Sequence, residues 1–220
     1  MDIEAFRASP IGRLTPISGT DIAVGESFNY WAFVPDPLPE TPQLSLSALN
    51  QATHAAMAVA RLDQALSQLP NPQLLVRPII RREAVSTSAL EGTFAEYDEV
   101  LEADFLEDRQ LSAEQREVYN FVRATETAVD MLQKLPISRS LLCHLQEIIV
   151  HGTPGYTYDT GDLRQRQVYI GARNRPIAEA RYVPPPNGDT LTLGFSDWEK
   201  WVNAGNHSGG AGVAGVSVSA

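Results

Sequence analysis

The chain has 220 residues, enough for one large or two small domains, and its hydrophobic fraction of 43% is that of an ordinary soluble globular protein. A formal net charge of −10 argues against nucleic-acid binding, because no basic excess is present to neutralise phosphates. The single cysteine excludes an internal disulfide framework, and no stretch approaches the roughly 18 apolar residues that a membrane span requires. We therefore expect a cytoplasmic protein that does not bind membranes.

The first 43 residues combine glycine, proline and isolated aromatic residues without a period. Residues 36–42 contain three prolines, which forbid a helix and restrict the residue before each of them, so this segment should be extended. Trp31 and Phe33 alternate with Ala32, so both rings could point to one side and dock the segment onto a helical body. The alternative is a loosely ordered leader with two exposed aromatic residues.

Apolar periodicity predicts that the chain from residue 45 to residue 150 is helical throughout, with short connections that favour antiparallel neighbours. Capping boxes mark two of the starts, Thr93 with Glu96 and Ser112 with Gln115, and Ser138 is expected to cap a further helix. The predicted helices span 45–69, 73–91, 94–105, 112–135 and 138–150.

Beyond residue 150 the pattern changes. Residues 168–170 and 182–183 are short β-capable runs on either side of a polar turn, and they form the one predicted hairpin. Ser196 with Glu199 reads as another capping box and predicts a short helix through residue 204. Residues 205–220 carry no charge and are rich in glycine, so we expect a flexible tail that is not native family sequence.

One carboxylate, Glu91, is in an unfavourable position for helix stability. Gly92 tolerates the left-handed conformation and is predicted to end the helix, which puts Glu91 in the last turn. There the helix dipole disfavours an anion by roughly 0.3–1 kcal/mol. Thr87 is four residues earlier and shares the face. Either Glu91 is a solvated residue on an acidic surface, or it is aimed at a cation outside its own helix.

The string TSALEG, from Thr87 to Gly92, resembles the inhibitory-helix motif S/T-x-x-x-E-G/N of Fic-family proteins. Residues 30–39, YWAFVPDPLP, resemble the extended N-terminal segment of that family. Residues 156–186 resemble its flap hairpin, with GDLR at 161–164, VYIG at 168–171 and ARYVPPP at 180–186. Order and spacing match the subclass whose inhibitory helix precedes the catalytic core, and the resemblance covers residues 27–204.

The resemblance implies an all-α, Fic-like helical bundle of about six to seven helices with one short β-hairpin flap, incomplete at the C-terminus. It implies three segments. Residues 1–110 would be the N-terminal helical region with the inhibitory helix, and residues 111–204 a partial core with the flap. Residues 205–220 would be the tail.

Fic proteins usually transfer AMP from ATP, with Mg²⁺, to a Ser, Thr or Tyr hydroxyl of a target protein. Their catalytic loop, HPFx(D/E)GNGRxxR, supplies the base, the metal-binding acid and the phosphate-binding groups. The four histidines are 54, 144, 151 and 207, and Pro-Phe follows none of them. We assign no catalytic residue and no metal ligand, and expect this chain alone to be inactive, because it stops about one helix before that loop would begin.

The resemblance assigns two groups of functional residues. Thr87, Glu91 and Gly92 would be autoinhibitory and lie near ATP, where the carboxylate would pair with a catalytic-loop arginine and crowd the γ-phosphate. The flap would dock the target by strand addition. Its residues are Val168, Tyr169, Ile170, Gly171, Arg181, Tyr182 and Val183.

Three functions remain open from the sequence. The chain could be the N-terminal part of an AMP-transferase. It could instead be a non-catalytic module that acts in trans on a separate Fic core or holds a target through the flap, and a homodimer is a further option. The third reading is a gene fragment without activity, in which exposed apolar helix faces would cause aggregation or require a partner.

Overall fold

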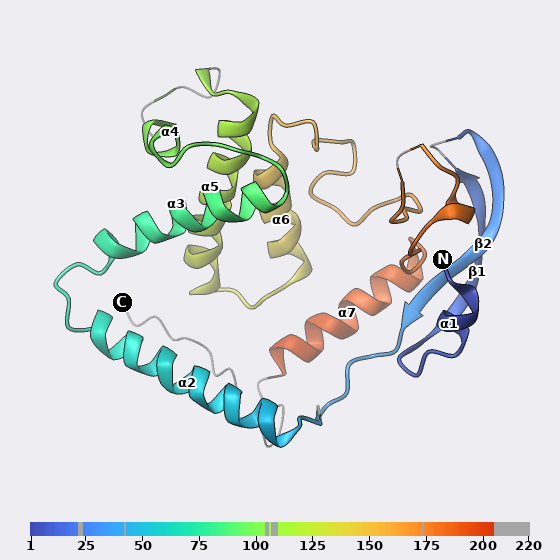
Figure 1. Cartoon of the computed structure of the whole chain (residues 1–220), viewed down its shortest axis with the longest axis horizontal. Helices are drawn as coiled ribbons and strands as arrows, with labels where there is room; N and C mark the ends of the chain where they lie inside the picture. The colour runs from blue at the N-terminus through green and yellow to red at the C-terminus, as the bar shows by residue number, and fades with distance from the viewer. Residues whose placement is uncertain (22–23, 42, 104–105, 107–109, 173, 205–220) are drawn as a thin grey trace. The chain divides into compact units, whose positions relative to one another are not determined.

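A computed structural model describes residues 1–21, 24–41, 43–103, 106, 110–172 and 174–204 (Figure 1). The described chain is mainly helical, with seven α-helices and one two-stranded antiparallel sheet, which confirms the predicted fold class. It divides into two compact units: residues 1–39 with 163–202, and residues 40–162 with 203–204. The tail predicted at 205–220 lies outside the described residues.

The first unit is built around a long hairpin near the N-terminus. Strands β1 (Gly12–Asp21) and β2 (Glu26–Pro35) pair in register from Gly12 opposite Pro35 to Asp21 opposite Glu26. The expectation of an aperiodic arm here was wrong. Ala32, Phe33 and Val34 are consecutive and all buried, at 0%, 5% and 9% exposure, so both faces of β2 are covered and the two-residue alternation is absent.

Phe33 docks as expected, although its partners are not a helical body. Its backbone N–H donates to Val183 O at 2.9 Å, and its ring lies 5.0 Å from that of Phe6 in helix α1 (Ile3–Arg7). Trp31 is only half-buried. The core of this unit joins the hairpin to the segment of the predicted flap and consists of Ala32, Ile177, Ala180 and Val183.

Helix α7 (Asp189–Asn203) completes the first unit and begins earlier than the sequence predicted. Ser196 therefore lies inside the helix and does not cap it. The start lies after Gly188, whose φ of 82° turns the chain, and whose carbonyl accepts from Thr192 N at 3.0 Å. A three-residue turn of 3₁₀-helix, η3 (Ile177–Glu179), precedes it.

The second unit holds five helices, and the caps predicted for three of them are found at Ser112 and Ser138 but not at Thr93. Ser45, Ser112 and Ser138 each accept a hydrogen bond from a first-turn backbone N–H. The exception is α4, where Glu96 and Glu99 form the capping box and Thr93 is not the cap. The helices are α2 (Leu46–Leu66), α3 (Gln73–Leu90), α4 (Tyr97–Glu102), α5 (Ala113–Leu132) and α6 (Arg139–Val150).

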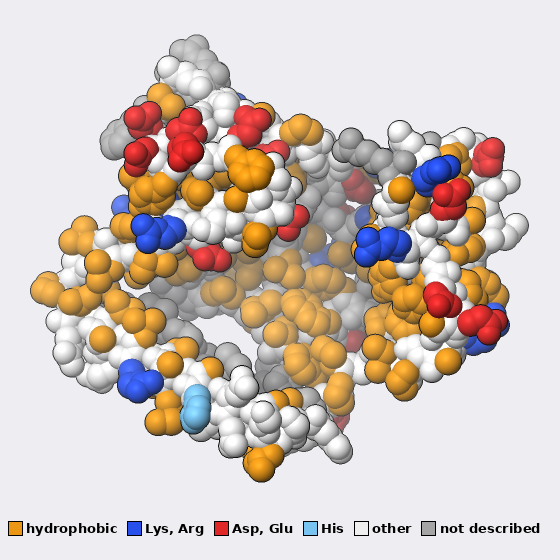
Figure 2. Space-filling model, viewed as in Figure 1, with side chains coloured by type: hydrophobic (Ala, Val, Ile, Leu, Met, Phe, Trp, Pro, Cys, Tyr) orange, Lys and Arg blue, Asp and Glu red, His pale blue; other side chains and the backbone are white. Residues whose placement is uncertain are grey.

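The core of the second unit lies between α3, α4 and α5, and consists of Ala84, Val100, Val118 and Val122. Helix α2 contributes nothing to it: none of its residues is buried, so its predicted apolar stripe is exposed. Figure 2 shows these hydrophobic side chains along α2 and the start of α3. Leu142 and Ile149 of α6 remain 37% and 38% exposed. Within the described residues, none of the helices has the length and apolarity to cross a membrane.

Candidate functional site

The C-terminal end of α3 is closed by a left-handed glycine. Gly92 has a φ of +93°, and Thr93 N donates back to Ser88 O at 2.9 Å. Glu91 is the C-cap residue, with φ −86° and ψ −2°. This geometry satisfies helix-end carbonyls and is strained for most residues other than glycine. The predicted end of the helix at Gly92 is confirmed.

The side chain of Glu91 is exposed and makes no hydrogen bond or ion pair with any residue that the structure describes. Its neighbour Leu90 is 86% exposed and Phe94 is 72% exposed. A carboxylate at a helix C-terminus, next to two solvent-exposed apolar side chains, is unfavourable for an isolated helix. The arrangement leaves the carboxylate available to a group outside this unit.

Thr87 does not tie α3 to another element. Its hydroxyl donates to Glu83 Oε1 at 3.2 Å, one turn back in the same helix. The hydrogen bond that links the end of α3 to another helix is made by Thr93, whose Oγ1 donates to Glu117 Oε2 of α5 at 2.6 Å. The sequence did not show this role of Thr93. A hydrogen bond to a carboxylate is among the stronger ones in proteins.

The body of α3 is fixed to α5 by packing and charge. Ala84 is fully buried against Val118 and Val122, and Arg81 is 8% exposed with its Nη1 3.9 Å from Glu126 Oε1. The sequence alone did not single out Arg81 as a buried residue. Its spacing of three residues from Ala84 places both on the buried face, which is the signal that could have identified it.

The predicted flap hairpin is present as one bridge. Ile170 N donates to Tyr182 O at 2.8 Å, and Arg181 N donates to Ile170 O at 2.7 Å. Gly171 lies so close to the returning arm that a Cβ there would come within 3.3 Å of Ala180 Cα. Only glycine fits this approach without a shift.

Side chains alternate along the first arm of the flap. Val168 and Ile170 are 45% and 58% exposed, whereas Tyr169 turns inward, its hydroxyl 3.1 Å from Asp21 Oδ1 and 2.6 Å from Arg175 O. Burial first, and then the hydrogen bond to Asp21, raise the pKa of Tyr169. Val168 and Ile170 therefore face outward on either side of Tyr169, whose hydroxyl is hydrogen-bonded on the inner side.

The returning arm of the flap is more buried. Val183 is fully buried, Tyr182 packs beside the rings of Phe6 and Phe33, and Arg181 is exposed. Burial raises the pKa of Tyr182, and the Arg164 guanidinium partly opposes that shift. Burial lowers the pKa of Arg164, which donates to Pro185 O.

Residues 49–130 match the family model of the Fic/DOC N-terminal region. This segment of the chain is therefore similar to the N-terminal region of Fic/DOC proteins. No curated protein matches it. The matched segment contains Thr87, Glu91 and Gly92, together with all of α3 and α4 and most of α5. The flap lies outside the match, so its assignment depends on the motifs at 161–186.

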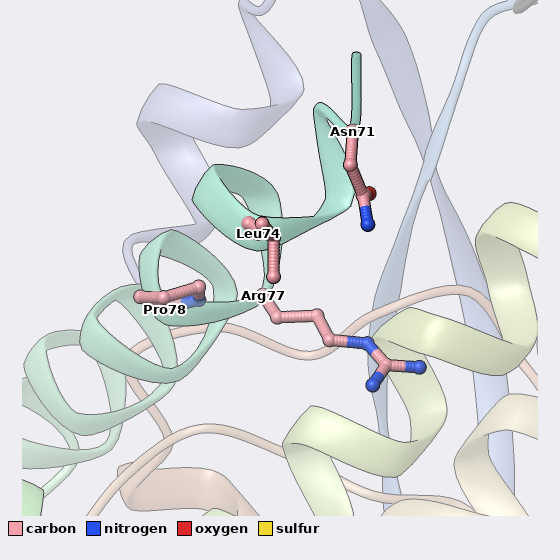
Figure 3. Close-up of a pocket in the computed structure, with 4 residues that line it drawn as sticks. All are labelled: Asn71, Leu74, Arg77 and Pro78. Carbon is pink, nitrogen blue, oxygen red and sulfur yellow. The ribbon is translucent and has the colours of Figure 1, made fainter. Parts of the chain in front are cut away.

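Within the part of the chain that the structure describes, no three His, Cys, Asp or Glu side chains are grouped as metal ligands would be. An open concavity lies at the start of α3 (Figure 3) and is lined by Asn71, Leu74, Arg77 and Pro78. Pro78 lacks an N–H, so it cannot make the helical hydrogen bond to Leu74 O. In Figure 3 the guanidinium of Arg77 reaches away from Pro78. The concavity lies near the opposite end of α3 from Glu91.

Proposed function

We propose that this chain carries the inhibitory and target-docking parts of a Fic-type AMP-transferase, with Glu91 as the inhibitory carboxylate. The reaction transfers AMP from ATP, with Mg²⁺, to a Ser, Thr or Tyr hydroxyl of a target protein. HPFx(D/E)GNGRxxR does not occur in these 220 residues, so the base and the phosphate-binding groups would come from sequence outside them. That sequence could be a continuation of this protein or a separate Fic core.

The observation that carries the proposal is the placement of Glu91. The residue ends a helix that is fixed to α5 by buried packing, while its own carboxylate is exposed and has no hydrogen-bond or ion-pair partner in the described residues. A carboxylate at the end of a fixed helix can pair with a catalytic-loop arginine and repel a γ-phosphate, since like charges at a few ångströms are unfavourable. Such repulsion would force ATP into a nonproductive pose.

The test combines this chain with a Fic core polypeptide that contains the catalytic loop, and measures transfer of labelled AMP. We expect the 220-residue chain alone to transfer none, and to inhibit the core when added. Glu91→Gly should abolish the inhibition. The matched control is Glu102→Gln, an exposed acid at the end of α4 whose removal should leave inhibition unchanged. Mg²⁺-dependent transfer by the chain alone would contradict the proposal.

A second candidate function is target binding by the flap without any part in inhibition. The exposed Val168 and Ile170 favour it, because strand addition places alternate side chains of one face against the partner. Ile170→Asp should then weaken capture of a target, whereas Glu91→Gly should not. Equal capture by both variants would count against the flap as the docking element.

A further inference from the structure

Asp21 is a buried carboxylate that neither proposed role uses. It ends β1 and is 4% exposed. Its Oδ2 accepts from the backbone N–H of Ile177 at 2.7 Å, and its Oδ1 lies 3.1 Å from the hydroxyl of Tyr169. Both partners belong to the flap and lie about 150 residues later in the chain, so the carboxylate joins two distant segments.

The two sides of this contact depend on each other. Ile177 is 2% exposed, so its N–H has little access to water and needs an acceptor within the protein. A buried carboxylate likewise needs donors, because an unpaired buried charge is costly. Removing the carboxylate would leave the Ile177 N–H without its acceptor, which costs more than a hydrogen bond gains.

The hairpin touches the flap at further points. Tyr30 OH donates to Ala178 O at 3.3 Å, and Phe33 N donates to Val183 O at 2.9 Å. Ala32 packs in one cluster with Ile177 and Val183. Together with Asp21, these contacts hold the first arm, the 3₁₀ turn and the returning arm of the flap.

We propose that the β1–β2 hairpin is a brace that fixes the flap, and that Asp21 is the positioning residue of this brace. Together with Arg175 O, Asp21 holds Tyr169 inward, which sets the face of the first arm that is presented and keeps Val168 and Ile170 outward. The functional consequence rests on the proposed role of the flap in target docking. The brace itself can be measured without nucleotide or target.

The experiment is amide hydrogen exchange, followed by NMR, on the full chain carrying substitutions at Asp21. Asp21→Leu should accelerate exchange of the Ile177 amide by at least about tenfold, because its acceptor is lost. Asp21→Asn should stay within about threefold of the parent, since the amide oxygen still accepts from Ile177 and the NH₂ can donate to the Tyr169 oxygen. Glu26→Leu, at the exposed register partner of Asp21, is the matched control and should change nothing in the flap.

Unchanged exchange at Ile177 in Asp21→Leu would overturn the proposal, and so would equal acceleration in α5, which would indicate global loosening. If Asp21→Leu does not fold, Tyr169→Phe removes only the hydroxyl. It should speed exchange of the Ile170 amide several-fold, and a failure to do so would also overturn the brace. With a Fic core present, Asp21→Leu should raise the KM for a target protein and leave the KM for ATP unchanged. A change confined to ATP would contradict a positioning role.

Discussion

The hydroxyl of Thr93 donates a 2.6 Å hydrogen bond to Oε2 of Glu117 and so joins the loop after α3 to the first half of α5. Two residues before Thr93 lies Glu91, whose carboxylate has no bond of its own among the described residues. The backbone position of Glu91 is therefore set in part by Thr93, which is hydrogen-bonded to a residue 24 positions later in the chain. Inhibition of the proposed kind needs the end of α3 to be held in one place, and this bond contributes to holding it.

Thr93→Val should loosen the end of α3. The substitution keeps the shape and removes the donor from a half-buried carboxylate, so the free energy of unfolding should fall by about 1–2 kcal/mol. Urea unfolding measures the loss, and Thr93→Ser, which retains the hydroxyl, should restore most of it. If both variants unfold at the same urea concentration as the parent, the bond does not stabilise the native state.

Gly92→Ala tests the left-handed helix end. The φ of +93° is open to glycine and strained for alanine, although no atom lies within 4 Å of the added Cβ. We expect a loss of roughly 1–2 kcal/mol in the free energy of unfolding, arising from the backbone alone. Gly92→Asn is the control and should lose less, since asparagine tolerates positive φ. If the alanine variant were as stable as the parent, residue 92 would not adopt the left-handed conformation, and α3 would end at another residue.

Local chemistry in the sequence located most of the helix boundaries in the second unit. Ser45, Ser112 and Ser138 cap helices, and Gly92 ends one, because each of these signals acts within about four residues. The same locality explains the false start at Thr93. Its hydroxyl is drawn to Glu117 of α5, a contact that a four-residue pattern cannot contain.

The hairpin near the N-terminus was not predictable from periodicity. Its second strand buries three consecutive residues, and its first strand contains Pro16, which a ladder seldom admits away from an edge. The pairing of Asp21 with Ile177 was likewise hidden, because the two are 156 residues apart. The resemblance at Thr87–Gly92 could be found in the sequence because the residues are contiguous. The contacts that hold α3 and the flap join residues far apart in the chain, so only the structure shows them.

Ala84→Leu tests the contact between α3 and α5. Ala84 is fully buried against Val118 and Val122, so three added carbon atoms have no room. Overpacking of this kind typically costs about 1–3 kcal/mol, and urea unfolding should show it. Ser86→Leu places the same side chain on an exposed position of the same helix and should change stability little. Equal behaviour of the two leucine variants would refute tight packing at this interface.

Asn120 holds the end of α6. Although its side chain is neither charged nor apolar, we expect its replacement to lower the free energy of unfolding. It is 3% exposed, and its Nδ2 donates to Ile149 O at 3.1 Å and to His151 O at 2.8 Å. Asn120→Ala should lower the free energy of unfolding by about 1–3 kcal/mol, because two helix-end carbonyls lose their donors in a buried site.

Asn120→Asp sharpens the test, since a carboxylate at neutral pH offers no donor and faces the same two carbonyl oxygens. It should therefore be less stable than Asn120→Ala. The control is Arg123→Ala, an exposed position one turn along α5, which should stay within about 0.5 kcal/mol of the parent. If the aspartate variant were the more stable of the two at position 120, the side chain would have to point away from α6, and the anchoring of that helix would rest on its apolar face alone.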